Sequence, residues 1–425
     1  MKNKIIAFDF LRALAIIMII PAHLSNFLFS TYSKLGLYAF DPYFANMGLG
    51  LFIFMSGYLL YYNNHSISSF QNILSFYRKR LLRIFPLYWA ALAAFILAFS
   101  VFAPKLNSGF LFPNAQNVFG FFNVLIHISG LQIFLAPAYA SPMLTLYFIG
   151  LIIVFYTIYP FIIMISKDAK HLLFVSSIVF LGFLLISRTF NIIDPRFFVF
   201  FPIFVFGILT CRKSLFEKSG TIFMRMPFVQ ILLAALPVIF VLIVVLGSRT
   251  VLFLDPKVSL TIDSAGSGTI ESSMVISMLS SVANSLGMNY PTLKFIIDSL
   301  LLNIFIVMFC SLEYRFAMKF ITDKFSSSLS SFFTYIATSS YCVYLFHRPF
   351  LAIWNAGTNF ISNPILRDII VIFVAIPLLF FISYHVQTFE LNLEKYISHE
   401  NVPDKDPSFK GSITGSKNKQ QEKID

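Results

Sequence analysis

The stretch FVQILLAALPVIFVLIVVL, residues 228–246, contains no charged side chain. A helix needs ~20 mostly apolar residues to cross a lipid bilayer, so this segment is long enough to span one. The run 295–310 is also long and mostly apolar. A β-barrel would instead show short segments of alternating polarity. The pattern therefore predicts an all-α polytopic membrane protein, because helices satisfy their own backbone hydrogen bonds within lipid.

The composition supports this fold class. Of the 425 residues, 58% are hydrophobic and 12% are charged, whereas about 25% of the residues in a soluble domain are charged. The net charge of +12 does not indicate nucleic-acid binding, since the Lys and Arg residues lie mostly between the apolar runs. There they orient the chain in the membrane, with basic loops in the cytosol.

About ten membrane spans are expected, with both termini in the cytosol. An eleven-span arrangement remains the alternative, because 116–135 is moderately apolar. A span there would place the later basic loops on the outer side, against the positive-inside rule. We therefore expect this piece to lie at the outer face or to dip partly into the bilayer. The predicted spans are 5–27, 43–62, 84–103, 143–165, 171–187, 196–210, 228–246, 295–312, 332–351 and 367–388.

The domain organisation is expected to be simple. Residues 1–390 form one transmembrane domain with a long outer loop at 247–292, which is rich in Ser, Thr and Gly. Residues 391–425 are polar and Lys-rich, so we expect a disordered cytosolic tail.

Three ionisable side chains lie in the first apolar segment: Asp9, Arg12 and His23. Charges inside a membrane helix are costly and mark functional sites. Arg12 and His23 are eleven residues apart, close to three helical turns, so a continuous helix places them on one face with Asp9 beside them. Asp9 and Arg12 could simply pair at the interface. His23 has the side chain best suited to exchange a proton near neutral pH, and it is the candidate catalytic base.

Five residues in three further segments are candidates for substrate contacts. Arg80 and Arg83 follow a basic cluster that could merely orient the chain, but guanidinium groups also match phosphate geometry. His347 and Arg348 lie at the outer end of the predicted span 332–351, where they could cap a helix or contact an acceptor. Ser56 precedes Gly57, a pair that favours close helix packing, and is also a candidate substrate contact.

Together, these segments resemble the acyltransferase-3 family of integral membrane O-acyltransferases. The resemblance covers the first ninety residues and 335–350, while hydropathy alone matches between them. It rests on FDFLRALA (8–15) with the Arg12-to-His23 spacing, FMSGY (54–58), RLLRIFPLY (80–88) and YCVYLFHRP (341–349). One departure lies at 147–156, where Tyr147 and Ile152 stand in place of the Trp and Glu of many members.

The resemblance implies transfer of an acyl group, usually acetyl, from acyl-CoA to a hydroxyl of a cell-surface glycan or lipid-linked saccharide. It implies His23 as the base, with Asp9 and Arg12 supporting it, and Arg80 and Arg83 as contacts to the CoA phosphates. Acetyl-CoA is then a substrate, and no permanently bound cofactor or metal is expected. The layout fits a multi-pass protein of a prokaryotic plasma membrane.

Two other functions remain open. A carrier or flippase for a glycolipid could use the polar residues of the first helix as a substrate path. It would move substrate without consuming acyl-CoA. A non-catalytic scaffold or sensor would not need His23.

Overall fold

A computed structural model describes residues 2–24, 41–65, 67, 69–102, 120–213, 280–285, 287, 290–321 and 327–400. Every regular element in these ranges is a helix, as the apolar runs predict. The N-terminal part contains α1 (Lys2–Ile19), α2 (Pro21–Leu24), α4 (Asp41–Asn64), α5 (Phe70–Val101), α7 (Gly120–Ser129), α8 (Gln132–Leu135), the short 3₁₀ turn Leu144–Leu146, α9 (Tyr147–Ile165), α10 (Ala169–Phe190) and α11 (Arg196–Lys213).

The C-terminal part contains longer helices with two π-helical turns. Its elements are α15 (Tyr290–Phe316), the π turn Ala317–Ile321, α17 (Ser327–Gly357), α18 (Pro364–Ile370), the π turn Val371–Ala375 and α19 (Ile376–Glu400). The first ten residues of the expected tail, 391–400, therefore continue α19. The rest of the tail and most of the outer loop, residues 247–279, lie outside the described residues, while residues 290–292 of the loop already belong to α15.

Several helix ends follow from local sequence. Ser69 and Asp168 accept hydrogen bonds from the backbone amides of Asn72 and His171, and so cap α5 and α10. These bonds satisfy amides that have no partner within the helix. The amide of His171 also lowers the pKa of Asp168, because it stabilises the charged carboxylate. At the other end of α10, Asn191 takes a left-handed conformation at φ 50°, which Asn tolerates well.

Seven helices within the described ranges are long and apolar enough to cross a membrane. The chain is therefore a multi-pass membrane protein. The candidate spans are Ile6–His23, Tyr43–Asn64, Phe70–Val101, Leu144–Ile165, Ala169–Phe190, Ser299–Lys319 and Pro364–Leu393. The predicted spans 196–210 and 332–351 coincide with α11 and α17, which are helices but not among these seven, and 228–246 lies outside the described residues.

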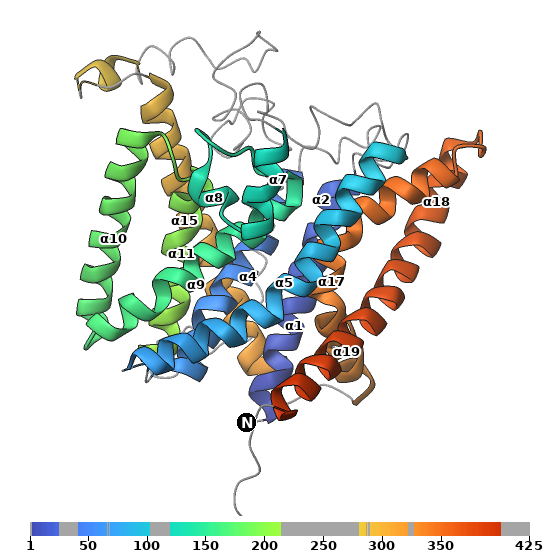
Figure 1. Ribbon diagram of the computed structural model, residues 1–425, viewed down its shortest axis with the longest axis horizontal. Helices are drawn as coiled ribbons and strands as arrows, with labels where there is room; N and C mark the ends of the chain where they lie inside the picture. Colours follow the sequence, from blue (N-terminus) through green and yellow to red (C-terminus); the bar gives the residue numbers. More distant parts are fainter. Residues whose placement is uncertain are drawn as a thin grey trace, which may run out of the picture.

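The segment 116–135 contains two short helices where it is described. α7 has 10 residues and α8 has 4. At 1.5 Å per residue, neither can cross a hydrocarbon core of ~30 Å. They lie together at one end of the bundle, opposite the start of α1 (Figure 1).

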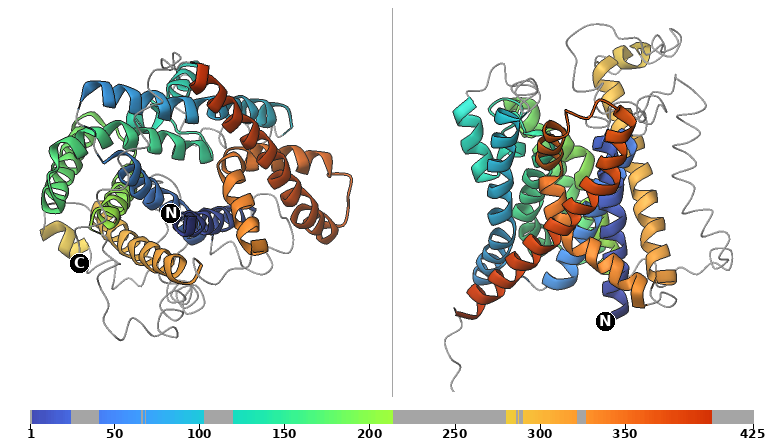
Figure 2. Two further views of the ribbon diagram at one scale, coloured as in Figure 1. Left: turned by 90° about the horizontal axis from the view of Figure 1, so that it is seen from below. Right: turned by 90° about the vertical axis from the view of Figure 1, so that its right-hand side faces the viewer.

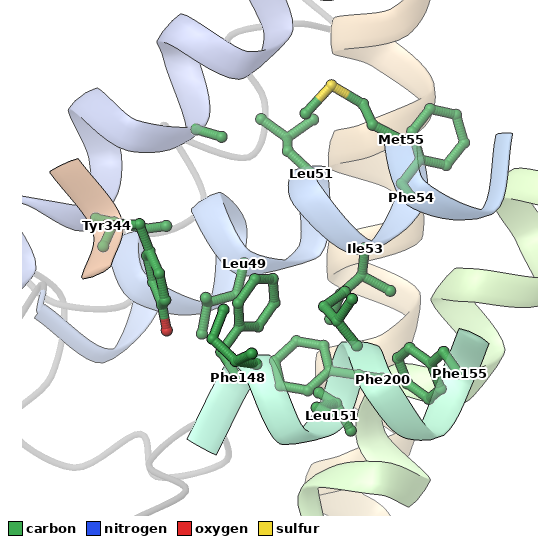
Figure 3. Packing of buried hydrophobic residues seen from close by; sticks show 14 of the residues in the cluster. Leu49, Leu51, Ile53, Phe54, Met55, Phe148, Leu151, Phe155, Phe200 and Tyr344 are labelled. Atoms are coloured by element: carbon green, nitrogen blue, oxygen red, sulfur yellow. The ribbon is translucent and has the colours of Figure 1, made fainter. Parts of the chain in front are cut away.

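Helix α1 lies within the bundle and packs against α4 and α17. Seen end-on, it is surrounded by the other helices (Figure 2). Helices α4 and α11 pack closely through glycine residues. A Cβ atom at Gly57 of α4 would lie only 2.1 Å from the carbonyl oxygen of Phe204. Likewise, a Cβ atom at Gly207 of α11 would lie 2.2 Å from the carbonyl oxygen of Phe54. These glycines let α4 and α11 cross at close range. Aromatic rings such as Phe155 and Phe200 fill the buried core around this crossing (Figure 3).

Candidate active site

A cavity of about 420 Å³ lies between α1, α4, α5, α9, α17 and α19. Three of its lining residues are arginines and none is acidic, so the cavity is positively charged. It is lined by Arg12, Phe52, Met55, Ser56, Leu59, Leu60, Asn63, Arg80, Arg83, Ile84, Phe148, Ile149, Ile152, Tyr156, Ala337, Thr338, Ser340, Tyr341, Tyr344, Gln387 and Leu391.

The three arginines come from two helices that are distant in sequence. Arg12 lies on α1, one turn after Asp9, and its Nη1 is 3.6 Å from the Asp9 Oδ1 atom. Asp9 is 8% exposed and also accepts a 3.0 Å hydrogen bond from Thr334 of α17. Asp9 therefore holds the guanidinium of Arg12 and connects α1 to α17. Arg12 and Arg83 both line the cavity.

Arg80 is held by aromatic faces. Its guanidinium carbon lies 5.7 Å from the ring centroids of both Phe76 and Tyr156, distances at which a cation is attracted to a ring. The hydroxyl of Tyr341 on α17 donates a 2.9 Å hydrogen bond to the carbonyl oxygen of Ile84. This bond joins α17 to the turn of α5 that carries the arginines.

The residues that depart from the family pattern lie beside this cavity. Ile152 lines the wall, so the position where many members have Glu supplies no carboxylate here. Tyr147 packs under Arg196, whose guanidinium carbon is 3.9 Å from the ring centroid. Arg196 also forms a 2.7 Å ion pair with Asp194. This end of α9 is therefore held by a stacked cation.

The second polar group is the histidine pair His23 and His347. Their rings stack with centroids 5.3 Å apart and planes at 17°. Arg348 Nη2 lies 2.9 Å from His23 Nδ1. The predicted substrate contacts His347 and Arg348 are thus brought to the predicted base His23, although more than 320 residues separate them in the sequence.

The two histidines are held by different local structures. His23 lies in α2, which begins at Pro21 after α1 has ended at Ile19. Proline has no backbone N–H and clashes with the preceding turn, so the helix breaks there. His347 lies inside α17, which continues to Gly357. The interpretation of His347 and Arg348 as a helix cap is therefore wrong.

His347 is buried with an exposed fraction of 0%. Its Nδ1 lies 2.8 Å from the carbonyl oxygen of Tyr344 and 3.2 Å from that of Val343. Its Nε2 has no hydrogen-bond partner within the described part of the chain. Leaving a buried polar atom unpaired costs about 1–3 kcal/mol, so such an atom is notable.

His127 shows what a structural histidine looks like in this protein. It is also 0% exposed, but its Nδ1 lies 2.7 Å from the carbonyl oxygen of Asn123, and its Nε2 accepts a 2.9 Å hydrogen bond from the amide of Met143. Burial lowers the pKa of His127 to about 4, because the charged form is poorly solvated. Both ring nitrogens of His127 are used by the fold, whereas only Nδ1 of His347 is.

Three aromatic rings of the cavity lining pack together, and one of them, Tyr344, also contacts the histidine pair. The lining residues of α17 run from Ala337 to Tyr344, and His347 follows one turn later. The Tyr344 ring is 5.0 Å from Phe148 and 6.5 Å from Phe52 by their centroids, and 6.0 Å from His347. Figure 3 shows Tyr344 and Phe148 within the buried cluster. We call Phe52, Phe148 and Tyr344 the ring partition.

The structure thus gives each predicted site residue a place. His23, His347 and Arg348 form one cluster, while Arg12, Arg80, Arg83 and Ser56 line the cavity and Asp9 lies behind Arg12. The sequence predicted that Asp9, Arg12 and His23 share one face of the first helix. In the structure, Asp9 and Arg12 belong to the cavity region, and His23 belongs to the histidine cluster. Arg12 and His23 are about 16 Å apart at 1.5 Å per residue, so Arg12 and Asp9 do not touch His23.

This combination of a cationic cavity and a histidine pair within a membrane helix bundle fits a membrane-bound group-transfer enzyme. The family model described as an acyltransferase domain, that of the acyltransferase-3 family, matches residues 5–384. The chain belongs to this family and is a membrane acyltransferase. No curated protein matches it, and no solved structure does.

Proposed function

We propose that the protein transfers an acetyl group from acetyl-CoA to a hydroxyl of a cell-surface glycan or lipid-linked saccharide, in a prokaryotic plasma membrane. The observation that carries the proposal is the cavity with three arginines and no lining carboxylate. Such a surface is matched by a polyanion, because an arginine fork binds phosphate oxygens with strong charge-assisted hydrogen bonds. CoA carries phosphates at one end and the thioester at the other.

The position of the histidine pair supports the same proposal. With its phosphates at Arg80 and Arg83, the donor would extend along the cavity toward the ring partition. The histidine pair adjoins this partition, because the His347 ring lies 6.0 Å from that of Tyr344. The acceptor hydroxyl would reach the pair from the end of the bundle where α7 and α8 lie, which we propose is the outer face. The oxygen of this hydroxyl attacks the thioester carbon and releases CoA.

The test uses the purified protein in lipid nanodiscs with acetyl-labelled acetyl-CoA and a cell-envelope saccharide extract. The measured quantities are free CoA and label in the saccharide fraction, in wild type and in His23→Ala. We expect CoA release that depends on the extract, with matching label in the saccharide, and a loss of at least a hundredfold in the variant. Transport of a glycolipid across vesicle membranes without consumption of acetyl-CoA would instead identify a carrier.

A further inference from the structure

The hydrogen bonds of the histidine pair fix where each ring carries its proton. His347 Nδ1 faces the carbonyl oxygens of Tyr344 and Val343. A carbonyl oxygen can only accept, so Nδ1 must be the protonated nitrogen. In a neutral ring, the lone pair then lies on Nε2, the atom that is buried and has no partner within the described part of the chain.

His23 has the opposite arrangement. Its Nδ1 lies 2.9 Å from Nη2 of Arg348, and a guanidinium group can only donate. His23 Nδ1 must therefore accept this bond, which places the proton of the ring on Nε2. A doubly protonated His23 could not accept it at all. In this structure, His23 has no lone pair left with which to remove a proton from a substrate.

We propose that His347, rather than His23, is the base that takes the proton of the acceptor hydroxyl. His23, held by Arg348, is the hydrogen-bond donor for the oxygen of the reacting thioester carbonyl. The proposal rests on the acyl transfer proposed above and divides the roles within its catalytic pair. It also gives the unpartnered Nε2 of His347 a ligand, the acceptor hydroxyl.

The transfer balances with these roles. The hydroxyl proton moves to His347 Nε2 as the acceptor oxygen bonds to the thioester carbon. The charge that develops on the carbonyl oxygen is stabilised by the N–H of His23. The carbon–sulfur bond then breaks, and the CoA thiolate takes the proton from His347. The nearby Arg348 disfavours a lasting positive charge on His347, which promotes this last proton transfer.

The same substitution at the two positions tests the assignment. Asparagine places an amide where the histidine Nδ1 lies, and has nothing at Nε2. His347→Asn thus keeps a donor toward the backbone carbonyls but loses the base, and we expect transfer to fall by at least about a thousandfold. His23→Asn keeps an acceptor for Arg348 but loses the N–H that stabilises the carbonyl oxygen, and we expect a smaller loss, of about a hundredfold. His385→Asn, on the exposed side of α19, is the matched control and should transfer at the wild-type rate.

An equal loss in His23→Asn and His347→Asn, or a larger loss in His23→Asn, would overturn the proposal. Size-exclusion profiles and unfolding temperatures of each variant show whether it has folded. The proposed function itself would fail differently: the wild-type protein would release no CoA from acetyl-CoA with any envelope saccharide. That outcome can be distinguished from the variant results above, which require an active wild type.

A second measurement needs no acceptor. Protein with ¹⁵N-labelled histidine in lipid reports the protonation of each ring nitrogen by NMR, and the Asn variants assign the signals by their loss. We expect His347 to be protonated at Nδ1 and unprotonated at Nε2, and His23 to be the reverse. A protonated Nε2 on His347 would overturn the proposal even if the protein is an acyltransferase.

Discussion

The arginine-lined cavity and the histidine pair both include residues of α17, yet their polar side chains are held in different ways. Arg12 is 34% exposed in its side chain and has one ion pair, at 3.6 Å, and Arg80 rests on two rings. His347 is completely buried and is fixed to backbone carbonyls at 2.8 and 3.2 Å. Long, loosely held cations suit the binding of a flexible donor, whereas chemistry needs groups fixed in position.

This comparison is tested most strongly at Arg80 and Arg83. Each hydrogen bond to a charged group contributes about 1.5–3 kcal/mol, and 1.4 kcal/mol is a tenfold change in affinity. We expect Arg80→Gln with Arg83→Gln to raise the KM for acetyl-CoA at least a hundredfold and to change kcat less than threefold. Initial rates over a range of acetyl-CoA concentrations measure both.

Arg78→Gln is the matched control, because Arg78 is on the same helix but is exposed and outside the cavity lining. It should change KM less than threefold. If the double variant lowers kcat and leaves KM unchanged, these arginines act in the chemical step. The distinction between a cavity that binds the donor and a histidine pair that performs the chemistry would then be wrong.

The ring partition is the boundary between the two regions, and it should limit the size of the acyl group. Phe52→Leu and Phe148→Leu remove ring volume but stay apolar. Each additional buried methylene contributes about 0.8 kcal/mol, so room for two should raise the butyryl-to-acetyl ratio of kcat/KM about tenfold. Competing transfer from butyryl-CoA and acetyl-CoA measures this ratio.

Phe54→Leu provides the control for the partition. Phe54 is buried on α4, two residues after Phe52, but packs against Tyr58, Phe206 and Tyr314 rather than lining the cavity. It should leave the ratio unchanged. If Phe54→Leu shifts the ratio as much as Phe52→Leu does, the effect arises from general loosening of the bundle.

The sequence predicted the helical fold and identified several residues of both regions, but not how they are divided. Apolar runs identify membrane helices because lipid imposes one strong constraint on length and polarity. The eleven-residue spacing of Arg12 and His23 indicated a shared face only for an unbroken helix, and Pro21 breaks it. The proline was visible in the sequence and could have given this warning.

Other site residues left a weaker signal or none. Gln387 lies within an apolar span and lines the cavity, and a polar side chain in such a span could have been identified as a candidate. Tyr156 and Tyr341 lie in long aromatic-rich segments, where a tyrosine that faces a cavity looks like any other. The stacking of His23 on His347 depends on the packing of α2 against α17, and periodicity within one helix carries no information about that contact.

The smallest expected effect on catalysis is at His127, which resembles His347 in burial but lies in α7 and does not line the cavity. The folded protein keeps His127 neutral, with a pKa of about 4, whereas the unfolded chain has an ordinary value near 6.5. Below pH ~6.5 the unfolded state binds a proton that the folded state does not. The free energy of unfolding should therefore decrease as the pH is lowered from ~6.5 to ~4, by about 3 kcal/mol in total.

Thermal unfolding of the protein in detergent between pH 4.5 and 7.5 measures this loss. His127→Gln cannot titrate, so its unfolding temperature should depend less on pH than that of the wild type, although two hydrogen bonds of the native ring are altered. Acetyl transfer at pH 7.5 should fall less than threefold, because His127 does not line the cavity and its ring nitrogens bond to backbone atoms of Asn123 and Met143. If His127→Gln instead lost transfer as severely as His347→Asn, then substitution of any buried histidine would abolish activity. The unpaired Nε2 of His347 would then not distinguish it from a structural histidine.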